Sequence, residues 1–523
     1  MATLALPRPG AFRARSVVGT RLLEAAGVLA LIGISLLLRS DQLGTHFWID
    51  EGLSVGIADR PLLDIPGVLV QVGSPPLYYM LLNLWIGIAG VGEVATHWLS
   101  LIFAVLCIPA GLWVGASLFD RRTGWTLAVL AALCPFLTTY AQETRMYSLV
   151  AFLGLLATGF FVHAYVRGHR GYRIPFGVTL ALLLYTHNWA LFLGAAYAIG
   201  VAIVWAAAPK GGDERRRLLR DALLGFGVAA VLYLPWVPTL VSQTLHTGAP
   251  WSNAPSFHAL IHAPDQVFGG FDGTVALLLA AGAGVVAVAR SGHFERRVLV
   301  PVLLVLAVAP ILIPWLTSQI SPAWAVRYLA AAVGPLLLLA AVGLRRAGGI
   351  GIAGLALIVL MWASFGAPSA KSNVYLLGEE LGPDLRRGDL VVSTQPELVP
   401  VLSHYLPRDD DLTFATPLGV TEDTGVTDWR DGIERFDASN VGEELIPLLD
   451  RVPEGGQVLL VTPIITSEAR WSAPWTRRVY DRTLEYEGVL RGDPRFELVA
   501  TLPDQARSLP PNPVQGLLFR KAG

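Results

Sequence analysis

Val298-Leu-Val-Pro-Val-Leu-Leu-Val-Leu-Ala-Val-Ala-Pro-Ile-Leu-Ile-Pro-Trp-Leu-Thr317 is a run of 20 residues without an ionisable side chain. A helix that crosses the hydrocarbon core of a bilayer needs roughly 20 mostly apolar residues. The run therefore predicts a membrane-spanning helix, and ten other segments have the same character. The eleven predicted spans are residues 17–38, 97–118, 124–140, 147–166, 174–187, 189–208, 220–238, 274–290, 298–317, 328–344 and 349–366.

The composition divides the chain into two predicted domains. Charged residues form only 15% of the 523 residues, whereas a soluble domain carries roughly 25%. Residues 1–366 hold 23 of the 39 Lys and Arg, and the remaining tail holds 16, so the character changes near Pro368. We predict a transmembrane domain over residues 1–367 and a soluble α/β domain over residues 368–523. In the tail, strands are expected at 389–393, 457–462 and 496–502, and helices at 397–405 and 476–491.

The positions of the basic residues predict the orientation of the chain. With a cytoplasmic N-terminus, 19 of the 23 basic residues of the transmembrane domain fall inside, as the positive-inside rule requires. The four that remain outside are Arg39, Arg60, Arg145 and Arg327. The C-terminal domain is then extracytoplasmic, at the plasma membrane. The predicted outer loops are residues 39–96, 141–146, 239–273 and 318–327.

The apolar run Pro75–Gly90 is not counted as a span. A twelfth span there would move every later Arg cluster to the outer side. We expect it to form a helix at the outer interface, where Tyr78, Tyr79 and Trp85 suit the headgroup level.

Several function classes are excluded by what the sequence lacks. The net charge is −1, so nucleic acid is not an expected partner. No P-loop and no G-x-G-x-x-G after a strand is present, which argues against a nucleotide-driven reaction. Cys107 and Cys134 both lie in apolar runs, so neither a disulfide framework nor a zinc site is indicated. The three lysines, Lys210, Lys371 and Lys521, receive no functional assignment.

The first cluster of candidate site residues is His46-Phe-Trp-Ile-Asp50-Glu51-Gly52, shortly after the first span. Two adjacent carboxylates beside a Trp at the membrane surface can supply a general base, a metal ligand or both. The alternative is structural, with Asp50 capping a helix that starts near Glu51.

The second cluster is Tyr140-Ala-Gln142-Glu143-Thr-Arg145-Met-Tyr147, at an outer turn between two spans. Ionisable residues at such positions are costly and are taken as functional by default. The alternative is a Glu143–Arg145 pair that satisfies itself.

Two further outer turns carry polar residues, Thr186-His187-Asn188 and Arg327-Tyr328. A lone His at a turn is also typical of a hydrogen-bonded packing residue. Arg suits a phosphate because its planar fork donates two hydrogen bonds and keeps its charge, although an interfacial Arg can also extend to lipid headgroups. Since the topology places all four clusters on one side, together they favour a site for a lipid phosphate that carries a polar group.

As an ordered set, these motifs resemble the GT-C membrane glycosyltransferases, specifically the group of the protein O-mannosyltransferases (glycosyltransferase family 39) and the lipid A aminoarabinose transferase. The resemblance covers residues 17 to about 345. It departs from the group at Thr96-His97-Trp98, where members commonly carry an Arg, and at Ser74, where a Lys or His often stands. The residues that carry it are the acidic pair 50–51, Pro75–Tyr79, Gln142–Tyr147, Thr186–Asn188 and the pair 327–328.

The resemblance implies transfer of a sugar from a polyprenyl-phosphate donor to an acceptor hydroxyl, with inversion. Asp50 would deprotonate the acceptor, which is a glycan, a lipid or a protein, and Arg145 and Arg327 would stabilise the lipid phosphate. Glu51 and Glu143 would orient the acceptor, the sugar or a divalent metal (Mg or Mn), whose possible ligands are Asp50 and Glu143. The predicted substrate-binding residues are Arg145, Arg327, Tyr328, His187, Tyr78, Tyr79, Gln142 and Tyr147.

Two other functions stay open on the sequence alone. A transporter or flippase for a lipid-linked sugar would show internal repeats and charges near mid-membrane. Here the charges cluster on one face and no repeat between halves is visible. A non-catalytic scaffold is the second alternative, and the intact acidic pair at 50–51 argues against it.

Overall fold

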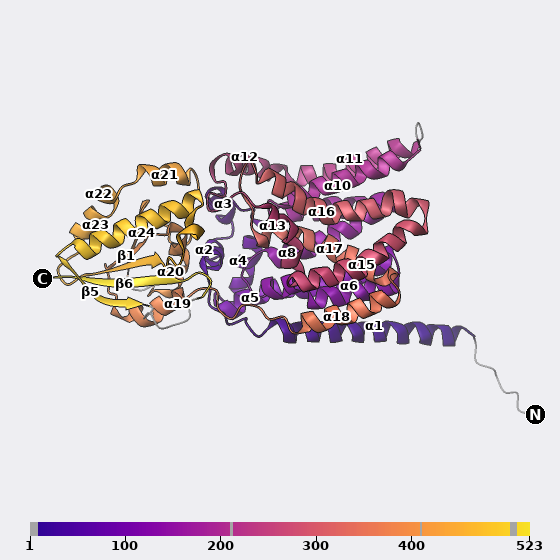
Figure 1. The fold of residues 1–523 in the computed structure, drawn as a ribbon, viewed down its shortest axis with the longest axis horizontal. Coiled ribbons are helices and arrows are strands. Elements are labelled where there is room, and N and C mark those ends of the chain that lie inside the picture. Colours follow the sequence, from indigo (N-terminus) through magenta and orange to yellow (C-terminus); the bar gives the residue numbers. More distant parts are fainter. Residues whose placement is uncertain (1–8, 210–212, 408–410, 503–509, 523) are drawn as a thin grey trace, which may run out of the picture.

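The protein is described by a computed structural model that covers residues 9–209, 213–407, 411–502 and 510–522. A bundle of helices forms one part, and a sheet domain lies at one end of it (Figure 1). Helix α11 (Asp213–Tyr233) begins at the opposite end of the bundle, and α15 (Phe271–Ser291) turns back there into α16 (Val300–Thr317) (Figure 1). Short helices of the first segment predicted to be an outer loop, hereafter the first outer segment, lie between the bundle and the sheet domain (Figure 1).

Eight helices in the described residues are long and apolar enough to cross a membrane. Each coincides with a predicted span. They run over Arg21–Arg39, Glu93–Leu118, Tyr147–Val166, Ala190–Ala207, Asp213–His246, Phe271–Ser291, Glu295–Thr317 and Val326–Arg346. The regular helices within them are α1 (Pro9–Arg39), α5 (Glu93–Leu118), α8 (Tyr147–Phe161), α10 (Ala190–Ala207), α11 (Asp213–Tyr233), α12 (Val237–His246), α15 (Phe271–Ser291), α16 (Val300–Thr317) and α17 (Ala330–Arg346).

The other three predicted spans contain shorter helices, so the count of eleven stays a prediction. The span 124–140 is divided between α6 (Arg121–Leu133) and α7 (Pro135–Tyr140). Pro135 causes the break, because the residue before a proline is pushed out of the helical region, and Cys134 has ψ 121°. The remaining two are α9 (Arg173–Leu184) and α18 (Gly349–Ala363).

The first outer segment folds into three short helices, α2 (Ile49–Ala58), α3 (Ile65–Val72) and α4 (Leu77–Ala89). Helix α4 has 13 residues, whereas a span needs roughly 20. Helices α6 and α9, with 13 and 12 residues, are as short, so the interpretation of Pro75–Gly90 as a helix that does not cross the membrane stays a prediction. The third outer segment adds α13 (Phe257–Ile261) and α14 (Ala263–Phe268).

The C-terminal domain contains a six-stranded mixed sheet of order β3-β2-β1-β4-β6-β5. Strand β1 is parallel to β2 and β4, and β6 is antiparallel to β4 and β5. The three predicted strands are present as β1, β4 and β5, whereas β2, β3 and β6 were not predicted. The strands are β1 (Leu390–Ser393), β2 (Thr413–Thr416), β3 (Gly419–Val420), β4 (Gln457–Pro463), β5 (Phe496–Leu502) and β6 (Val514–Lys521).

Helices cover both faces of this sheet. Alternate residues of β1 and β4, such as Val391 and Leu459, pack against α20, while their neighbours Val392 and Leu460 pack against α23 and α24. Both predicted helices are present, as α20 with the turn before it and as α24. The helices are α19 (Val374–Leu376), α20 (Val399–Tyr405), α21 (Gly432–Ala438), α22 (Val441–Glu444), α23 (Ile446–Arg451) and α24 (Pro474–Gly492).

The first outer segment contributes to the hydrophobic core of the C-terminal domain. Phe47 and Val55 are buried in the same cluster as Val391 and Leu459. Helix α2 also approaches the domain's backbone, because a Cβ added at Gly52 would overlap Val401. The domain is therefore packed on α2, the helix that carries the acidic pair, and is not a loosely tethered appendage.

Candidate active site

Asp50 lies in the first turn of α2, between two arginines from distant parts of the chain. Its Oδ2 is 3.4 Å from Nε of Arg327 and 3.9 Å from Nη2 of Arg145. Helix α2 begins at Ile49, with the Glu51 carboxylate accepting the backbone N–H of Trp48. Asp50 therefore does not cap the helix, and its carboxylate faces the two guanidinium groups instead.

Arg327 is enclosed by aromatic rings. Its guanidinium carbon lies 5.6 Å from the ring centroid of Trp48, 5.2 Å from that of Trp251 and 5.5 Å from that of Tyr328. Rings at such distances attract a cation through their negative faces. The side chain is only 24% exposed, so the structure holds it at Asp50 rather than extended toward lipid headgroups.

Arg145 fastens the second outer turn to the first outer segment. Its Nη1 donates to the backbone oxygen of Asp50 at 3.2 Å, to Oγ of Ser54 at 3.0 Å and to the hydroxyl of Tyr79 at 3.5 Å. Its ion pair is with Asp50, and none joins it to Glu143 among the described residues. The self-satisfying Glu143–Arg145 pair is therefore not found.

Six buried polar atoms around this cluster make no hydrogen bond within the described residues. They are Nε1 of Trp48, Oδ2 of Asp50, Oε2 of Glu143, Nε of Arg145, the hydroxyl oxygen of Tyr147 and Nε of Arg327. A buried polar atom without a partner costs about 1–3 kcal/mol. Such atoms are rare in folded proteins, so six at one place indicate a site that accepts a polar ligand.

Burial raises the pKa of Glu143 from 4.5 to about 7. The negative charges of Glu51 and Asp50 add to this effect, and the positive charges of Lys371 and Arg327 oppose it. A carboxyl group with such a pKa exchanges its proton near neutral pH, which is the property that general acid–base chemistry requires.

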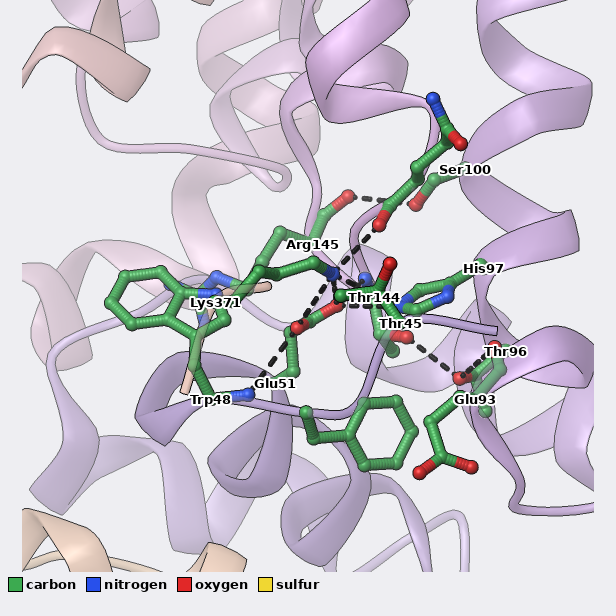
Figure 2. A network of polar contacts seen from close by, with 12 residues as sticks. Thr45, Trp48, Glu51, Glu93, Thr96, His97, Ser100, Thr144, Arg145 and Lys371 are labelled. Carbon is green, nitrogen blue, oxygen red and sulfur yellow. Dashed lines mark hydrogen bonds and ion pairs between the residues drawn. The ribbon is translucent and has the colours of Figure 1, made fainter. Parts of the chain in front are cut away.

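Glu51, although adjacent to Asp50, belongs to a separate buried network. Its Oε1 accepts from the backbone N–H of Thr144 at 2.8 Å and lies 2.6 Å from Nε2 of His97. The ammonium of Lys371 donates to both of its oxygens at 2.9 Å. Figure 2 shows the carboxylate turned toward Lys371, Thr144 and His97.

The charges of this network set the ionisation of Glu51. Burial alone would raise its pKa, but the charges of Lys371 and His97 and their hydrogen bonds outweigh burial and lower the pKa to about 2. The carboxylate is therefore ionised, fully buried and surrounded by donors. Its oxygens are engaged with the protein itself, unlike the Oδ2 of Asp50.

Comparison with solved structures identifies the fold of the whole chain. The crystal structure of ArnT from Cupriavidus metallidurans in the apo state matches with a TM-score of 0.59 and 14% identity, over 97% of this chain and 99% of that one. The chain has the GT-C fold. No protein-family model and no curated protein sequence matches the chain.

Two other proteins share the GT-C fold with this chain. The archaeal oligosaccharyltransferase AglB from Archaeoglobus fulgidus, in complex with an inhibitory peptide and a dolichol-phosphate, matches with a TM-score of 0.52 and 13% identity, over 84% of this chain and 69% of that one. The arabinofuranosyltransferase AftD from Mycobacteria matches with a TM-score of 0.55 and 14% identity, over 95% of this chain and 40% of that one.

Within the GT-C fold, several predicted site residues gather around the Asp50 cluster. Tyr79 contacts Arg145, and Arg145 lies over the ring of Tyr147 at 5.7 Å. The ring centroid of Tyr328 is 4.7 Å from that of His187 and 6.4 Å from that of Tyr147. His187 accepts the backbone N–H of Trp189 through Nδ1, so it serves packing as well as lining the site.

Two other predicted residues direct their polar groups into the protein. The Gln142 side chain accepts the N–H of Gln42 at 2.7 Å and donates to the carbonyl of Thr138 at 3.1 Å. The hydroxyl of Tyr78 pairs with that of Ser100 at 3.2 Å. These side chains hold the outer turns together beside the site.

The site does not fit a divalent metal well. Within the described residues no group of three or more His, Cys, Asp or Glu side chains is placed to hold one. Asp50, one of the two predicted ligands, already faces two guanidinium groups that would repel a cation. A structure of the Archaeoglobus fulgidus oligosaccharyltransferase contains Zn and sulfate, but no step proposed for this chain depends on a metal.

Three residues of the site region, Lys371, His97 and Trp251, were not predicted from the sequence. His97 stands where the sequence departs from the pattern of the group that it resembles, and this departure was the only signal. Lys371 is one of three lysines, and nothing in its neighbourhood along the chain marks it as buried. Its contacts follow from the docking of the C-terminal domain.

Proposed function

We propose that this protein is a glycosyltransferase that moves a sugar from a polyprenyl-phosphate donor to an acceptor hydroxyl. One observation carries the proposal: Asp50 is held between Arg145 and Arg327, on helix α2, which lies at the end of the bundle that faces the C-terminal domain (Figure 1). Each of the two permanent positive charges lies within 4 Å of the carboxylate. A base and a phosphate-binding pair are what such a transfer requires.

Arg145 and Arg327 bind the phosphate of the donor. An Arg guanidinium donates two parallel hydrogen bonds to phosphate oxygens and keeps its charge at every physiological pH. The structure of ArnT bound to undecaprenyl phosphate and that of AglB with a dolichol-phosphate support a lipid phosphate as the ligand. When the phosphate arrives, the arginines exchange their weak contacts with Asp50 for hydrogen bonds to it.

Asp50 then acts on the acceptor. Released from the arginines, its carboxylate takes the proton of the acceptor hydroxyl as the oxygen attacks the anomeric carbon. The bond from that carbon to the phosphate oxygen breaks, and its electron pair stays on the lipid phosphate, where Arg145 and Arg327 stabilise it. Donors aimed at developing charge contribute about 3–4 kcal/mol each in comparable sites. Attack opposite the leaving phosphate inverts the anomeric configuration.

The neighbouring residues receive supporting roles. Glu143, with its pKa near 7, exchanges protons beside Asp50 and orients the acceptor. Trp48, Trp251 and Tyr328 keep Arg327 in place and offer apolar faces to the sugar. Glu51, buried in its own network, positions Asp50 and does not contact substrate.

The orientation of the reaction follows from the distribution of basic residues. Helix α2, which carries Asp50, and the C-terminal domain lie at the end of the bundle opposite to the α15–α16 turn (Figure 1). That turn carries Arg290, Arg296 and Arg297. Since basic clusters favour the cytoplasm, we place the site and the C-terminal domain outside it, with the N-terminus inside. The acceptor is then a glycan, a lipid or a protein of the cell envelope.

The test uses purified full-length protein in detergent with a panel of radiolabelled polyprenyl-phosphate sugars and membrane extract as acceptor source. Wild type is compared with Asp50→Asn and with the control Asp64→Asn, an exposed aspartate of the same outer segment. We expect label in an acceptor with wild type and Asp64→Asn, and roughly 10²–10⁴-fold less with Asp50→Asn.

The opposite results are equally clear. Donor binding without transfer from any sugar, together with movement of the donor lipid across proteoliposome membranes, would establish a transporter or flippase instead. Equal transfer by wild type and Asp50→Asn would remove Asp50 from the role of base. Neither binding nor transfer would leave the scaffold as the surviving function.

A further inference from the structure

Lys371 belongs to the C-terminal domain, but its ammonium contacts residues of the GT-C domain. It is buried, at the start of the chain segment that leads from the last helix of the bundle to the sheet. Its backbone oxygen accepts a hydrogen bond from the Asn512 side chain. The next residue, Ser372, forms an isolated parallel β-bridge with Asn512. Asn512 precedes β6, so the lysine's backbone is anchored to the sheet.

The ammonium of Lys371 joins two outer segments. It donates to both carboxylate oxygens of Glu51 at 2.9 Å and to the backbone oxygen of Gln142 at 2.8 Å. It also lies 3.3 Å from Nε2 of His97, on α5. Four parts of the chain, namely the C-terminal domain, α2, the second outer turn and α5, therefore meet at one nitrogen atom (Figure 2).

The groups that Lys371 holds are direct neighbours of the site residues. Glu51 follows Asp50 on α2, and Gln142 precedes Glu143. The same Glu51 carboxylate accepts the N–H of Thr144, which lies between Glu143 and Arg145. A shift of the ammonium would thus displace all three site residues, although Lys371 contacts none of their side chains through a hydrogen bond in the described structure.

We propose that Lys371 is a positioning residue, through which the docked C-terminal domain sets the geometry of the transfer site. The inference rests on the proposed function, because the residues it positions are those assigned to binding the phosphate and activating the acceptor. It gives the C-terminal domain a defined role: the domain holds the site residues in position without contacting the substrate itself.

The chemistry of a buried ion pair suits this role. A buried carboxylate that loses its partner is left with an uncompensated charge, which is strongly destabilising. Loss of the ammonium would therefore favour a movement of Glu51 toward water, and such a movement would pull on the first turn of α2. A Lys ammonium is compact and has three donors, which fits two carboxylate oxygens and one carbonyl, whereas the planar Arg fork needs more room.

A second contact supports the same coupling. The hydroxyl of Tyr405, on α20, accepts the N–H of Phe47 at 2.7 Å and donates to Glu93 at 2.7 Å. It ties the chain just before α2 to the start of α5. The C-terminal domain thus holds α2 from both sides, at Phe47 and at Glu51.

The test compares wild type, Lys371→Met, Lys371→Arg and the control Lys521→Met. Lys521 lies in the same domain, but its ammonium donates to the carbonyls of Leu449, Asp450 and Val452, within that domain. The unfolding midpoint is recorded on full-length protein to establish that each variant folds. Two quantities then test the proposal: amide hydrogen exchange of segments 46–56 and 141–147, and the Kd for undecaprenyl phosphate. None of them requires a sugar or an acceptor.

We expect Lys371→Met to speed amide exchange at Thr144 at least tenfold and to raise the Kd for undecaprenyl phosphate at least fivefold, because Arg145 is displaced. A loss of folded molecules alone would lower the number of binding sites and leave the Kd unchanged. Lys371→Arg should give an intermediate result, and Lys521→Met should match wild type in both quantities. Unchanged exchange and an unchanged Kd in Lys371→Met would overturn the proposal.

If Lys371→Met fails to fold, the double variant Glu51→Gln, Lys371→Met removes the uncompensated carboxylate and restores a foldable chain. It should still show fast exchange at Thr144, since the bridge between the segments is gone. Wild-type exchange in that variant would refute the positioning role. If wild type transfers no sugar, but amide exchange and the Kd still differ between wild type and Lys371→Met, the proposed function is rejected. The positioning role of Lys371 then still stands.

Discussion

Nε of Arg327 lies 3.4 Å from Oδ2 of Asp50, and this contact joins the 3-10 turn Val326–Leu329, which leads into α17, to the first turn of α2. The two atoms are within ion-pair distance but make no hydrogen bond in the described structure. The pair therefore compensates charge without satisfying either partner. An anion with several oxygens can take the guanidinium from Asp50 at little cost, and this exchange has consequences for both binding and catalysis.

Replacing Asp50 by Asn should separate binding from catalysis. A general base typically contributes a factor of roughly 10²–10⁴, so transfer should fall by about that factor. Undecaprenyl phosphate should bind at least as tightly as to wild type, because the carboxylate no longer competes for the arginines. Isothermal titration with the lipid phosphate, beside the radiolabel assay, checks both parts. Weaker binding by Asp50→Asn would show that Asp50 does not compete with the phosphate.

Replacing Arg327 by Lys should weaken donor binding. Lys keeps the charge but loses the planar fork that stacks on Trp48 and Trp251 and donates two parallel hydrogen bonds. We expect the KM for the donor to rise about tenfold or more, equivalent to roughly 1.4 kcal/mol. The matched control is Arg60→Lys, since Arg60 pairs with Asp423 outside the site at 3.0 Å. A donor KM that changes equally in both variants would contradict the assignment of Arg327.

The raised pKa of Glu143 predicts a pH-dependent contribution to stability. Because its pKa is about 7 in the folded protein against 4.5 ordinarily, the folded chain holds this proton more tightly. The contribution is complete below about pH 4.5 and is lost as the pH rises through about 7. The unfolding midpoint of wild type should therefore fall, relative to Glu143→Gln, as the pH rises over this range.

The control for this measurement is Glu454→Gln, which removes an exposed carboxylate of the C-terminal domain. Its curve should run parallel to that of wild type. If the curve of Glu143→Gln also ran parallel, the proton of Glu143 would not be held more tightly in the folded state.

Replacing Gly52 by Ala should loosen the C-terminal domain. Ala is the better helix former by about 1 kcal/mol, but its Cβ would overlap the backbone and side chain of Val401. We expect a lower unfolding midpoint and faster proteolysis of the C-terminal domain. Gly67→Ala, on α3, is the matched control because nothing lies within 4 Å of the added Cβ. That variant should be as stable as wild type or more so, and equal behaviour of the two would disprove the close docking of α2.

The fold was largely predictable because its signals are local. Long apolar runs such as residues 298–317 predict spans from their own composition, and eight of them are helices of sufficient length in the described part of the chain. Prediction was weaker where a proline divides a run, as at Pro135, and for strands that are short or interrupted. Strand β2 has only four residues, and β6 contains Gly516 and ends in basic residues.

The two acidic residues of the first outer segment illustrate the limit for the site. The sequence placed Asp50 and Glu51 together as a pair for chemistry. In a helix of 3.6 residues per turn, neighbouring side chains point about 100° apart. Asp50 therefore faces the arginines while Glu51 faces His97 and Lys371. The pair Asp50-Glu51 does not predict how α2 is rotated about its own axis, and this rotation decides what each carboxylate faces.

The sequence by itself determined that this is a membrane protein of many helices with polar clusters in the turns between them, because hydropathy and charge act residue by residue along the chain. Only the tertiary structure decided which of those residues meet. The contact of Lys371 with Glu51 spans 320 positions, and it exists because Phe47 and Val55 are buried in the core of the C-terminal domain. Such packing is a property of the assembled surfaces, and no local pattern encodes it.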